Sequence, residues 1–231
     1  MTERIFCFGD SNTWGYAPGD LMTPRYPRET RWPGVLARLS GREVIEAGLC
    51  GRTAAFDDPD MPGRNGARAL PRALEEAGTP DYAVIMLGTN DCKRVYGATA
   101  EEIGQGLSLC LDILAGVILP SRILVVSPPY LGENVWRPDR DPAFSPESVA
   151  LSRELKTVYR AIAAKRGHLF LAASDAVRAE AWDEEHLDPA GHLRLGEAIN
   201  AALFGGEGQT ALKPGAGANA GSDLPGRSQA E

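Results

Sequence analysis

Four side chains in this sequence have the chemistry that acyl transfer needs. Ser11 offers a hydroxyl nucleophile, His186 an imidazole that can take its proton, and Asp183 a carboxylate that can fix the imidazole tautomer. Asp183 and His186 are three positions apart, so the carboxylate can reach Nδ1 and leave Nε2 facing outward. Asn90, in a Gly-Thr-Asn-Asp turn, could donate a hydrogen bond to an oxyanion. The set is complete without a cofactor, and we predict none.

These residues are far apart in the sequence, so the fold must bring them together. Short β-rich runs predict five strands, at residues 4–8, 43–47, 82–87, 122–127 and 168–172. Three of these runs are apolar without alternation, which is typical of parallel strands covered on both faces. Ligands of open parallel sheets bind beyond the carboxyl ends of the strands. We therefore expect the polar residues that follow these strands to meet at one edge.

Helical patterns separate the predicted strands. Thr99 and Glu102 form a capping box before one helix, and Ser145 with Pro146 begins another that should end at Gly167. Shorter helices are expected near residues 32–39, 67–77 and 189–203. The alternation of strand and helix predicts a three-layer α/β domain over residues 1–204.

The composition of the chain limits which partners the protein can bind and where in the cell we expect it. The chain has 231 residues, with 24 Lys and Arg against 31 Asp and Glu, a net charge of -7. This balance argues against nucleic acid and anionic membranes as partners, and no run approaches the roughly 20 apolar residues of a membrane span. The four cysteines form no C-x-x-C pair, and the start has an acid where a signal peptide would be basic, so we predict a cytoplasmic protein. Residues 205–231, rich in Gly, Ala, Ser and Pro, predict a disordered tail.

Four blocks of the sequence resemble, in order and at ordinary spacing, those of the SGNH (GDSL) hydrolases. They are Gly9-Asp10-Ser11, the block around Gly51, Gly88-Thr89-Asn90-Asp91 and Asp183-x-x-His186. The resemblance spans almost the whole chain up to the predicted tail. Within that superfamily, residues 7–15, 31–32, 48–53, 57–59 and 85–91 look similar to the bacterial arylesterase/acyltransferase branch. We accordingly predict a flavodoxin-like fold whose five-stranded parallel sheet has the order 2-1-3-4-5.

The resemblance also implies a role for each matching residue. Ser11 would be the nucleophile, His186 the general base and then acid, and Asp183 its orienting carboxylate. The oxyanion hole would consist of the backbone N–H groups of Ser11 and Gly51 and the side-chain amide of Asn90. Two departures from the family pattern leave the substrate preference open: Cys50 and Gly51 stand where some relatives carry Ser and Ala, and Tyr16 stands where some carry Trp.

Other interpretations of the residues near Ser11 remain open. Asp10 could orient His186 in place of Asp183, although a carboxylate in such a turn more often bonds nearby backbone N–H groups. Trp14 and Tyr16 flank Ser11 and, together with Asp10, are candidates to line a substrate pocket. Residues 128–144 form a long connection that could wall the pocket or contact another subunit.

A metal site is the alternative use of the C-terminal histidines. His186 and His192, with Asp183 and Asp188, have the side chains of metal ligands. The remaining imidazole, His168, lies in a predicted strand, so we predict no bound metal.

Taken together, the sequence predicts a serine esterase that hydrolyses small or aromatic carboxylic esters through an acyl-enzyme. Acyl transfer or perhydrolysis would compete when an alcohol or hydrogen peroxide replaces water. A carbohydrate acetylesterase, or a lipid or thioester hydrolase with the same catalytic set, is the alternative, and a binding protein without catalysis is a third. Expected partners are a small-molecule ester, an acyl-acceptor alcohol or water, and a second copy of the chain in a homo-oligomer.

Overall fold

The computed structural model describes residues 2–19, 22, 24–179 and 181–205. Its sheet is entirely parallel, with the order β2-β1-β3-β4-β5, so the predicted fold class and strand order are confirmed. The strands are β1 Arg4–Gly9, β2 Glu43–Gly48, β3 Tyr82–Met86, β4 Ile123–Ser127 and β5 Leu169–Ala172. The tail predicted for residues 205–231 lies, apart from Gly205, outside the described residues.

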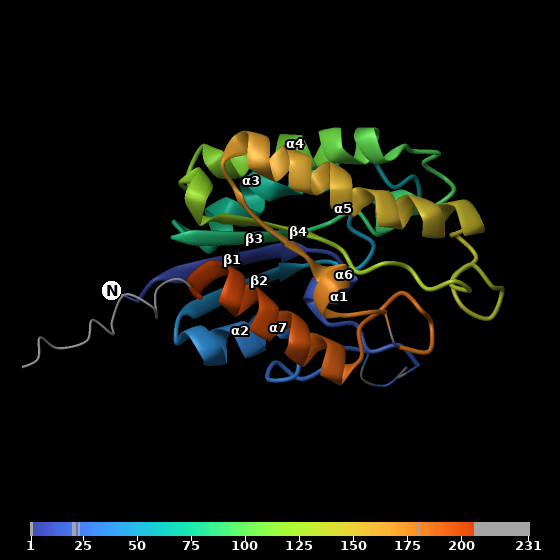
Figure 1. Cartoon of the computed structure of the whole chain (residues 1–231), viewed down its shortest axis with the longest axis horizontal. Coiled ribbons are helices and arrows are strands. Elements are labelled where there is room, and N and C mark those ends of the chain that lie inside the picture. Colours follow the sequence, from blue (N-terminus) through green and yellow to red (C-terminus); the bar gives the residue numbers. More distant parts are fainter. Residues whose placement is uncertain (1, 20–21, 23, 180, 206–231) are drawn as a thin grey trace, which may run out of the picture.

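Helices cover both faces of the sheet (Figure 1). One face carries α2 (Trp32–Ser40) and α7 (Pro189–Phe204), and the other carries α3 (Gly66–Ala77), α4 (Ala100–Ala115) and α5 (Pro146–Arg166). Shorter turns complete the chain; these are α1 Ser11–Trp14, α6 Ala173–Ala176 and the 3-10 turns η1 Asn90–Cys92 and η2 Pro120–Arg122. This arrangement is the predicted three-layer α/β architecture.

The helices that were predicted from capping residues begin and end at those residues in the structure. The Thr99 hydroxyl accepts a hydrogen bond from the Glu102 backbone N–H at 3.2 Å, and the Glu102 carboxylate accepts one from the Thr99 N–H at 2.8 Å. Ser145 caps α5 with Pro146 at the first helical position, and Gly167 ends that helix in the left-handed conformation at φ 70°.

The continuous apolar sequence of these strands is explained by burial of both faces of the sheet. In β1, Phe6 and Phe8 pack into the core under α3, α4 and α5, whereas Ile5 and Cys7 pack into the core under α2 and α7. Successive side chains of a strand point to opposite faces, so both sets must be apolar. The sheet is thereby held rigidly between two cores, and its carboxyl edge provides a fixed platform.

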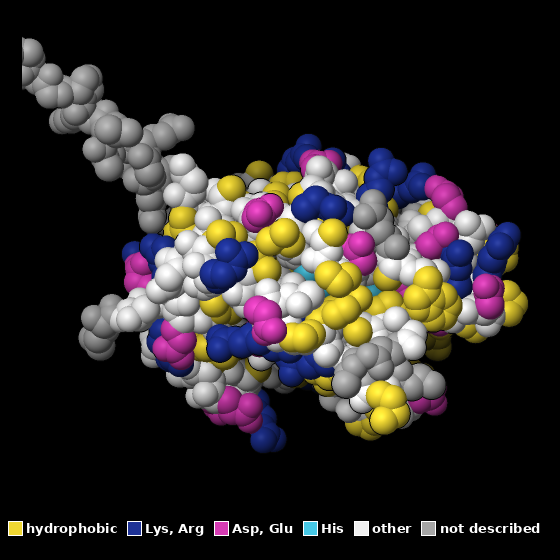
Figure 2. Space-filling view, turned by 90° about the horizontal axis from the view of Figure 1, so that it is seen from below, with side chains coloured by type: hydrophobic (Ala, Val, Ile, Leu, Met, Phe, Trp, Pro, Cys, Tyr) yellow, Lys and Arg dark blue, Asp and Glu magenta, His cyan; other side chains and the backbone are white. Residues whose placement is uncertain are grey.

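The surface mixes charges of both signs. On the face shown in Figure 2, Lys and Arg side chains are interspersed with Asp and Glu, and no single basic area dominates. Among the helices of the described residues, none is both long enough and apolar enough to cross a bilayer.

Candidate active site

Ser11 is positioned by the tight turn between β1 and α1. Asp10 caps the helix, with its Oδ1 accepting a hydrogen bond from the Asn12 N–H at 3.0 Å, and Ser11 is the first helical residue. A Cβ on Gly9 would lie 2.0 Å from the Thr13 hydroxyl, so only glycine lets the helix turn back so closely on the strand. The turn places Ser11 at the carboxyl edge of the sheet.

Asp183 and His186 lie in the loop that precedes α7. The Asp183 Oδ1 accepts backbone hydrogen bonds from Glu185 at 3.1 Å and His186 at 3.0 Å, and its Oδ2 is 2.6 Å from Nδ1 of His186. The Nδ1–H therefore donates to the carboxylate, which leaves Nε2 free to accept from the Ser11 hydroxyl at 2.9 Å. The structure thus brings Ser11, His186 and Asp183 into one hydrogen-bonded chain.

Asn12 joins the two halves of this arrangement. Its side-chain amide donates to the Glu185 carbonyl at 3.2 Å, and its oxygen accepts from the Leu187 N–H at 2.9 Å. Because both bonds are buried, they fix the loop with His186 against the helix with Ser11. Asn12 was not among the predicted site residues, although its position directly after Ser11 was a signal that could have indicated it.

The ionisation states of His186 and Asp183 follow from burial and neighbouring charges. Burial alone would lower the pKa of His186, but the carboxylates of Glu185, Asp183 and Asp10 raise it above its ordinary value. For Asp183, burial acts to raise the pKa, and the hydrogen bonds and charge of His186 lower it below the ordinary value. Asp183 is thus held ionised and can stabilise a protonated His186.

Three hydrogen-bond donors lie at the same edge as Ser11. In the described part of the chain, the backbone N–H groups of Ser11 and Gly51 donate to no protein atom. Asn90, at the start of η1, donates from Nδ2 to the carbonyl of Arg52 at 3.2 Å, which fixes its amide while it lines the same cavity as Ser11 and Gly51. The three residues that were predicted to supply oxyanion donors therefore line one cavity.

Gly51 is needed both for its backbone and for the space it leaves. Its φ of 79° is a left-handed conformation that favours glycine, and a Cβ there would lie 2.4 Å from the guanidinium carbon of Arg64. Arg64 is held in place by Asp58, with Nη1 and Oδ2 2.6 Å apart. A cation is thereby fixed beside Gly51, one of the predicted oxyanion donors.

A cavity of about 370 Å³ opens over Ser11 and His186. Tyr16 lines it, with its ring centroid 4.6 Å from that of His186. The lining also includes Pro18, Cys50, Gly51, Arg64, Asn90, Lys93, Arg140, Asp141, Trp182, Asp183 and Glu185. The cavity is therefore small and rich in polar side chains, and Ser11, which is otherwise buried, faces it.

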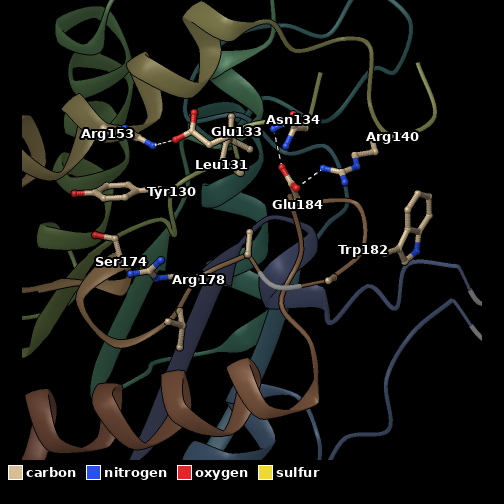
Figure 3. Close-up of a pocket in the computed structure, with 14 residues that line it drawn as sticks. Tyr130, Leu131, Glu133, Asn134, Arg140, Arg153, Ser174, Arg178, Trp182 and Glu184 are labelled. Carbon is tan, nitrogen blue, oxygen red and sulfur yellow. Dashed lines mark hydrogen bonds and ion pairs between the residues drawn. The ribbon is translucent and has the colours of Figure 1, made fainter. Parts of the chain in front are cut away.

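A second cavity, of about 790 Å³, shares Arg140 and Trp182 with the first (Figure 3). Glu184 lines the larger cavity: its carboxylate is paired with Arg140 and accepts from the Asn134 N–H at 2.7 Å, and its carbonyl accepts from the Gly132 N–H at 2.8 Å. Glu184 has a positive φ of 58°, which is uncommon for a residue other than glycine. The loop of residues 128–144 is thus fastened to the residue next to Asp183; it walls this second cavity and contributes Arg140 and Asp141 to the cavity over Ser11.

Comparison with known proteins identifies the family. The model of the GDSL-like lipase/acylhydrolase family matches residues 7–196. The chain belongs to this family. It is thus a serine ester hydrolase, of the SGNH type that the sequence blocks resemble.

Two solved esterases share the fold of this GDSL hydrolase. The aryl esterase of M. smegmatis is 35% identical with a TM-score of 0.79, and the match covers 91% of this chain and 100% of that one. Est24, a carbohydrate acetylesterase from Sinorhizobium meliloti, is 36% identical with a TM-score of 0.78, and the match covers 88% and 99% of the two chains. Comparison with curated proteins gave no significant match.

Two predicted pocket residues of the GDSL hydrolase lie elsewhere. Trp14 does not line the cavity over Ser11, because α1 turns its indole under the guanidinium of Arg25, 4.9 Å from the ring centroid. Asp10 does not line it either: its side chain is buried as the helix cap, and burial raises its pKa to about 6. Asp10 also does not replace Asp183, whose carboxylate is the one bonded to Nδ1 of His186.

His192, the second histidine of the alternative metal site, makes contacts of its own. Nδ1 of His192 accepts a hydrogen bond of 3.4 Å from the Trp32 N–H, and its ring packs edge-on against Tyr26. Burial lowers its pKa to about 4, so the ring is neutral. Over the described residues of the GDSL hydrolase, no group of three or more potential ligand side chains converges.

Five charged residues at the cavity were not among the predicted site residues. Arg64, Lys93 and Arg140 bring three cations, Asp141 brings a carboxylate, and Glu185 adds a buried carboxylate beside His186. Of these, only Glu185 lay within a motif, between Asp183 and His186. The others belong to loops of the GDSL hydrolase whose paths no periodicity indicates.

Proposed function

We propose that this protein hydrolyses small or aromatic carboxylic esters through an acyl-enzyme formed on Ser11. The observation that carries this proposal is the hydrogen-bonded chain from Asp183 through His186 to Ser11 at an accessible cavity. The family supports the reaction class. The likeness to the M. smegmatis aryl esterase supports aryl esters as substrates.

In the acylation step, Ser11 Oγ attacks the ester carbonyl carbon while its proton passes to Nε2 of His186. Asp183 keeps the other proton at Nδ1 and stabilises the imidazolium. The carbonyl oxygen becomes an oxyanion that accepts hydrogen bonds from the N–H groups of Ser11 and Gly51 and from the Asn90 amide. The bond to the alcohol then breaks, and His186 gives its proton to the departing oxygen.

In the deacylation step, a hydroxylic acceptor takes the place of the alcohol. Water attacks the acyl carbon, gives a proton to His186 and releases the carboxylic acid, and Ser11 recovers its proton. An alcohol in the same place would yield a new ester, and hydrogen peroxide a peracid. Acyl transfer and perhydrolysis are thus competing outcomes of the same acyl-enzyme.

The alcohol part of the substrate would extend into the larger cavity. Tyr130 and Trp182 contribute aromatic surface to it, which suits a flat alcohol group. Ser174, Asn134 and Arg178 add polar groups that could bond to sugar hydroxyls. A carbohydrate acetylesterase is therefore the second candidate, and the likeness to Est24 supports it.

Replacement of Trp182 tests where the alcohol binds. Because an aromatic contact contributes about 0.5–1.5 kcal/mol beyond buried area, Trp182→Ala should raise KM about three- to tenfold for aryl acetates and acetylated sugars, with little change in kcat. Methyl acetate, whose small alcohol group does not fill the larger cavity, should show a much smaller rise in KM. Steady-state kinetics over a panel of esters measures these effects.

The same panel decides the substrate class. Trp136→Phe is the matched control, because Trp136 lines neither cavity. An equal rise in KM for methyl acetate would show that Trp182 does not contact the alcohol.

A wild-type preference for long-chain esters or thioesters would overturn the proposal in favour of a lipid or thioester hydrolase.

The rate should fall as the pH falls and His186 becomes protonated. Carboxylates of Glu185, Asp183 and Asp10 raise the pKa of His186, so the midpoint of this fall in kcat/KM should lie above pH 6.5, the ordinary histidine value. Initial rates with p-nitrophenyl acetate, followed from acid to mildly alkaline pH, measure the midpoint. A rate independent of pH, or a midpoint below 6.5, would contradict the role of His186 as the base.

A further inference from the structure

Glu185 places a buried carboxyl group beside the reacting nitrogen of His186. Its Oε1 lies 3.9 Å from Nε2, the same nitrogen that is 2.9 Å from Ser11 Oγ. The side chain is only 7% exposed, yet it lines the cavity over Ser11. Glu185 is therefore on the side of the imidazole at which an acyl acceptor must arrive.

No donor satisfies this carboxyl group within the described residues. The backbone of Glu185 is bonded at both its N–H and its carbonyl, but its side-chain oxygens take part in no protein hydrogen bond there. Neither oxygen is fully enclosed by protein, so both are open to the cavity, where a water molecule can bind them. Besides His186, Lys93 is a cation that acts on Glu185 electrostatically, and its Nζ lies 3.2 Å from Oδ2 of Asp141.

We infer that Glu185 is a specificity-determining residue that selects water as the acyl acceptor over simple alcohols. The inference rests on the acyl-enzyme proposed above. Two hydrogen bonds of ~2.8 Å donated at the ~105° angle of one water molecule span about 4.4 Å, and a bend of roughly 10° in each bond shortens this span to about 4 Å. A single water can therefore donate to Nε2 of His186 and to the Glu185 carboxylate together. The separation of 3.9 Å between these atoms fits such a bridge.

The chemistry separates water from a monohydric alcohol. Water forms a new C–O bond to the acyl carbon and gives one proton to His186, while its second hydrogen is held by Glu185 and stays on the oxygen of the product acid. The bond between the acyl carbon and Ser11 Oγ breaks, and His186 returns its proton to Oγ. An alcohol gives its single hydroxyl hydrogen to His186, so its carbon faces the carboxylate without a hydrogen bond.

Two variants of Glu185 test this selection against a matched control. Glu185→Gln keeps the shape and a weaker, neutral acceptor, and Glu185→Met removes the acceptor. Glu197→Gln changes an exposed carboxylate on α7 and should behave as wild type. Each protein is supplied with p-nitrophenyl acetate in aqueous methanol. The ratio of methyl acetate to acetate is measured, together with the burst of nitrophenolate that reports acylation.

Because hydrogen bonds to ionised groups are about twice as strong as neutral ones, Glu185→Gln should slow hydrolysis of the acyl-enzyme about three- to tenfold and Glu185→Met at least tenfold. Methanolysis should change less than about twofold, so the product ratio should rise by nearly the same factors. An unchanged ratio in folded Glu185→Gln would overturn the inference, even if Glu185→Met fails to fold. Failure of the acyl-enzyme proposal itself would show differently, as a wild type with neither a burst nor methyl acetate.

Discussion

Ser11→Ala is expected to lower kcat with p-nitrophenyl acetate by about 10⁴- to 10⁶-fold. The substitution removes the atom that forms the acyl bond, and the hydroxyl that donates to Nε2 of His186. Some acceleration over the uncatalysed reaction should remain, since the oxyanion donors and the cavity are intact. Reaction of the wild type with a serine-directed phosphonate, located by mass spectrometry, should modify Ser11.

A second serine at the same edge of the sheet gives the control. Ser127 ends β4, is buried, and its hydroxyl has no hydrogen-bond partner among the described residues. Ser127→Ala should therefore leave both kcat and phosphonate labelling unchanged. Full activity of Ser11→Ala, or labelling at another residue, would show that the nucleophile is misassigned.

Asn90→Ala should reduce kcat by about 10²- to 10³-fold, with a much smaller change in KM. The Asn90 amide is expected to bond to the carbonyl oxygen of the substrate once that oxygen carries negative charge. Its removal should therefore reduce stabilisation of the transition state more than binding of the ester. Two backbone donors, from Ser11 and Gly51, would remain, and turnover should be impaired without being abolished. Single-turnover acylation rates at saturating p-nitrophenyl acetate measure the effect on the chemical step.

The control for this change is an asparagine outside the cavity. Asn200 lies in α7, and its side-chain oxygen has no partner in the described part of the chain. Asn200→Ala should keep the wild-type acylation rate. Should Asn90→Ala instead raise KM alone, the amide would be a ground-state contact, and the oxyanion would have to be held by other groups.

Much of the fold could be predicted because its signals are local. The run Ile5-Phe6-Cys7-Phe8 is apolar at every position, and the structure buries it between two cores. Thr99 with Glu102, and Gly167 at the end of α5, mark helix ends through bonds between near neighbours in sequence. The meeting of Ser11 with His186 followed from these elements, since parallel strands deliver their carboxyl ends to one edge.

The remainder depends on contacts between distant segments. Trp14 was expected in the pocket because it is near Ser11 in sequence, but the single turn of α1 sends it toward Arg25. Arg64 reaches the cavity only because Gly51 leaves room for its guanidinium and Asp58 holds it. No residue spacing in the sequence predicts these contacts between side chains from distant segments. The roles of Ser11, Asn90 and the other site residues, the tail and the homo-oligomer stay predictions.

Glu184 links the shape of the larger cavity to the catalytic loop. It follows Asp183 directly, and its carboxylate and carbonyl together hold Gly132, Asn134 and Arg140 of the loop that walls that cavity. A bulky alcohol that pushes this wall outward would also pull on the carboxylate that aligns the imidazole. Evolution or engineering of the loop would consequently alter turnover together with substrate range, and the two traits could be separated only by first cutting the tether at Glu184.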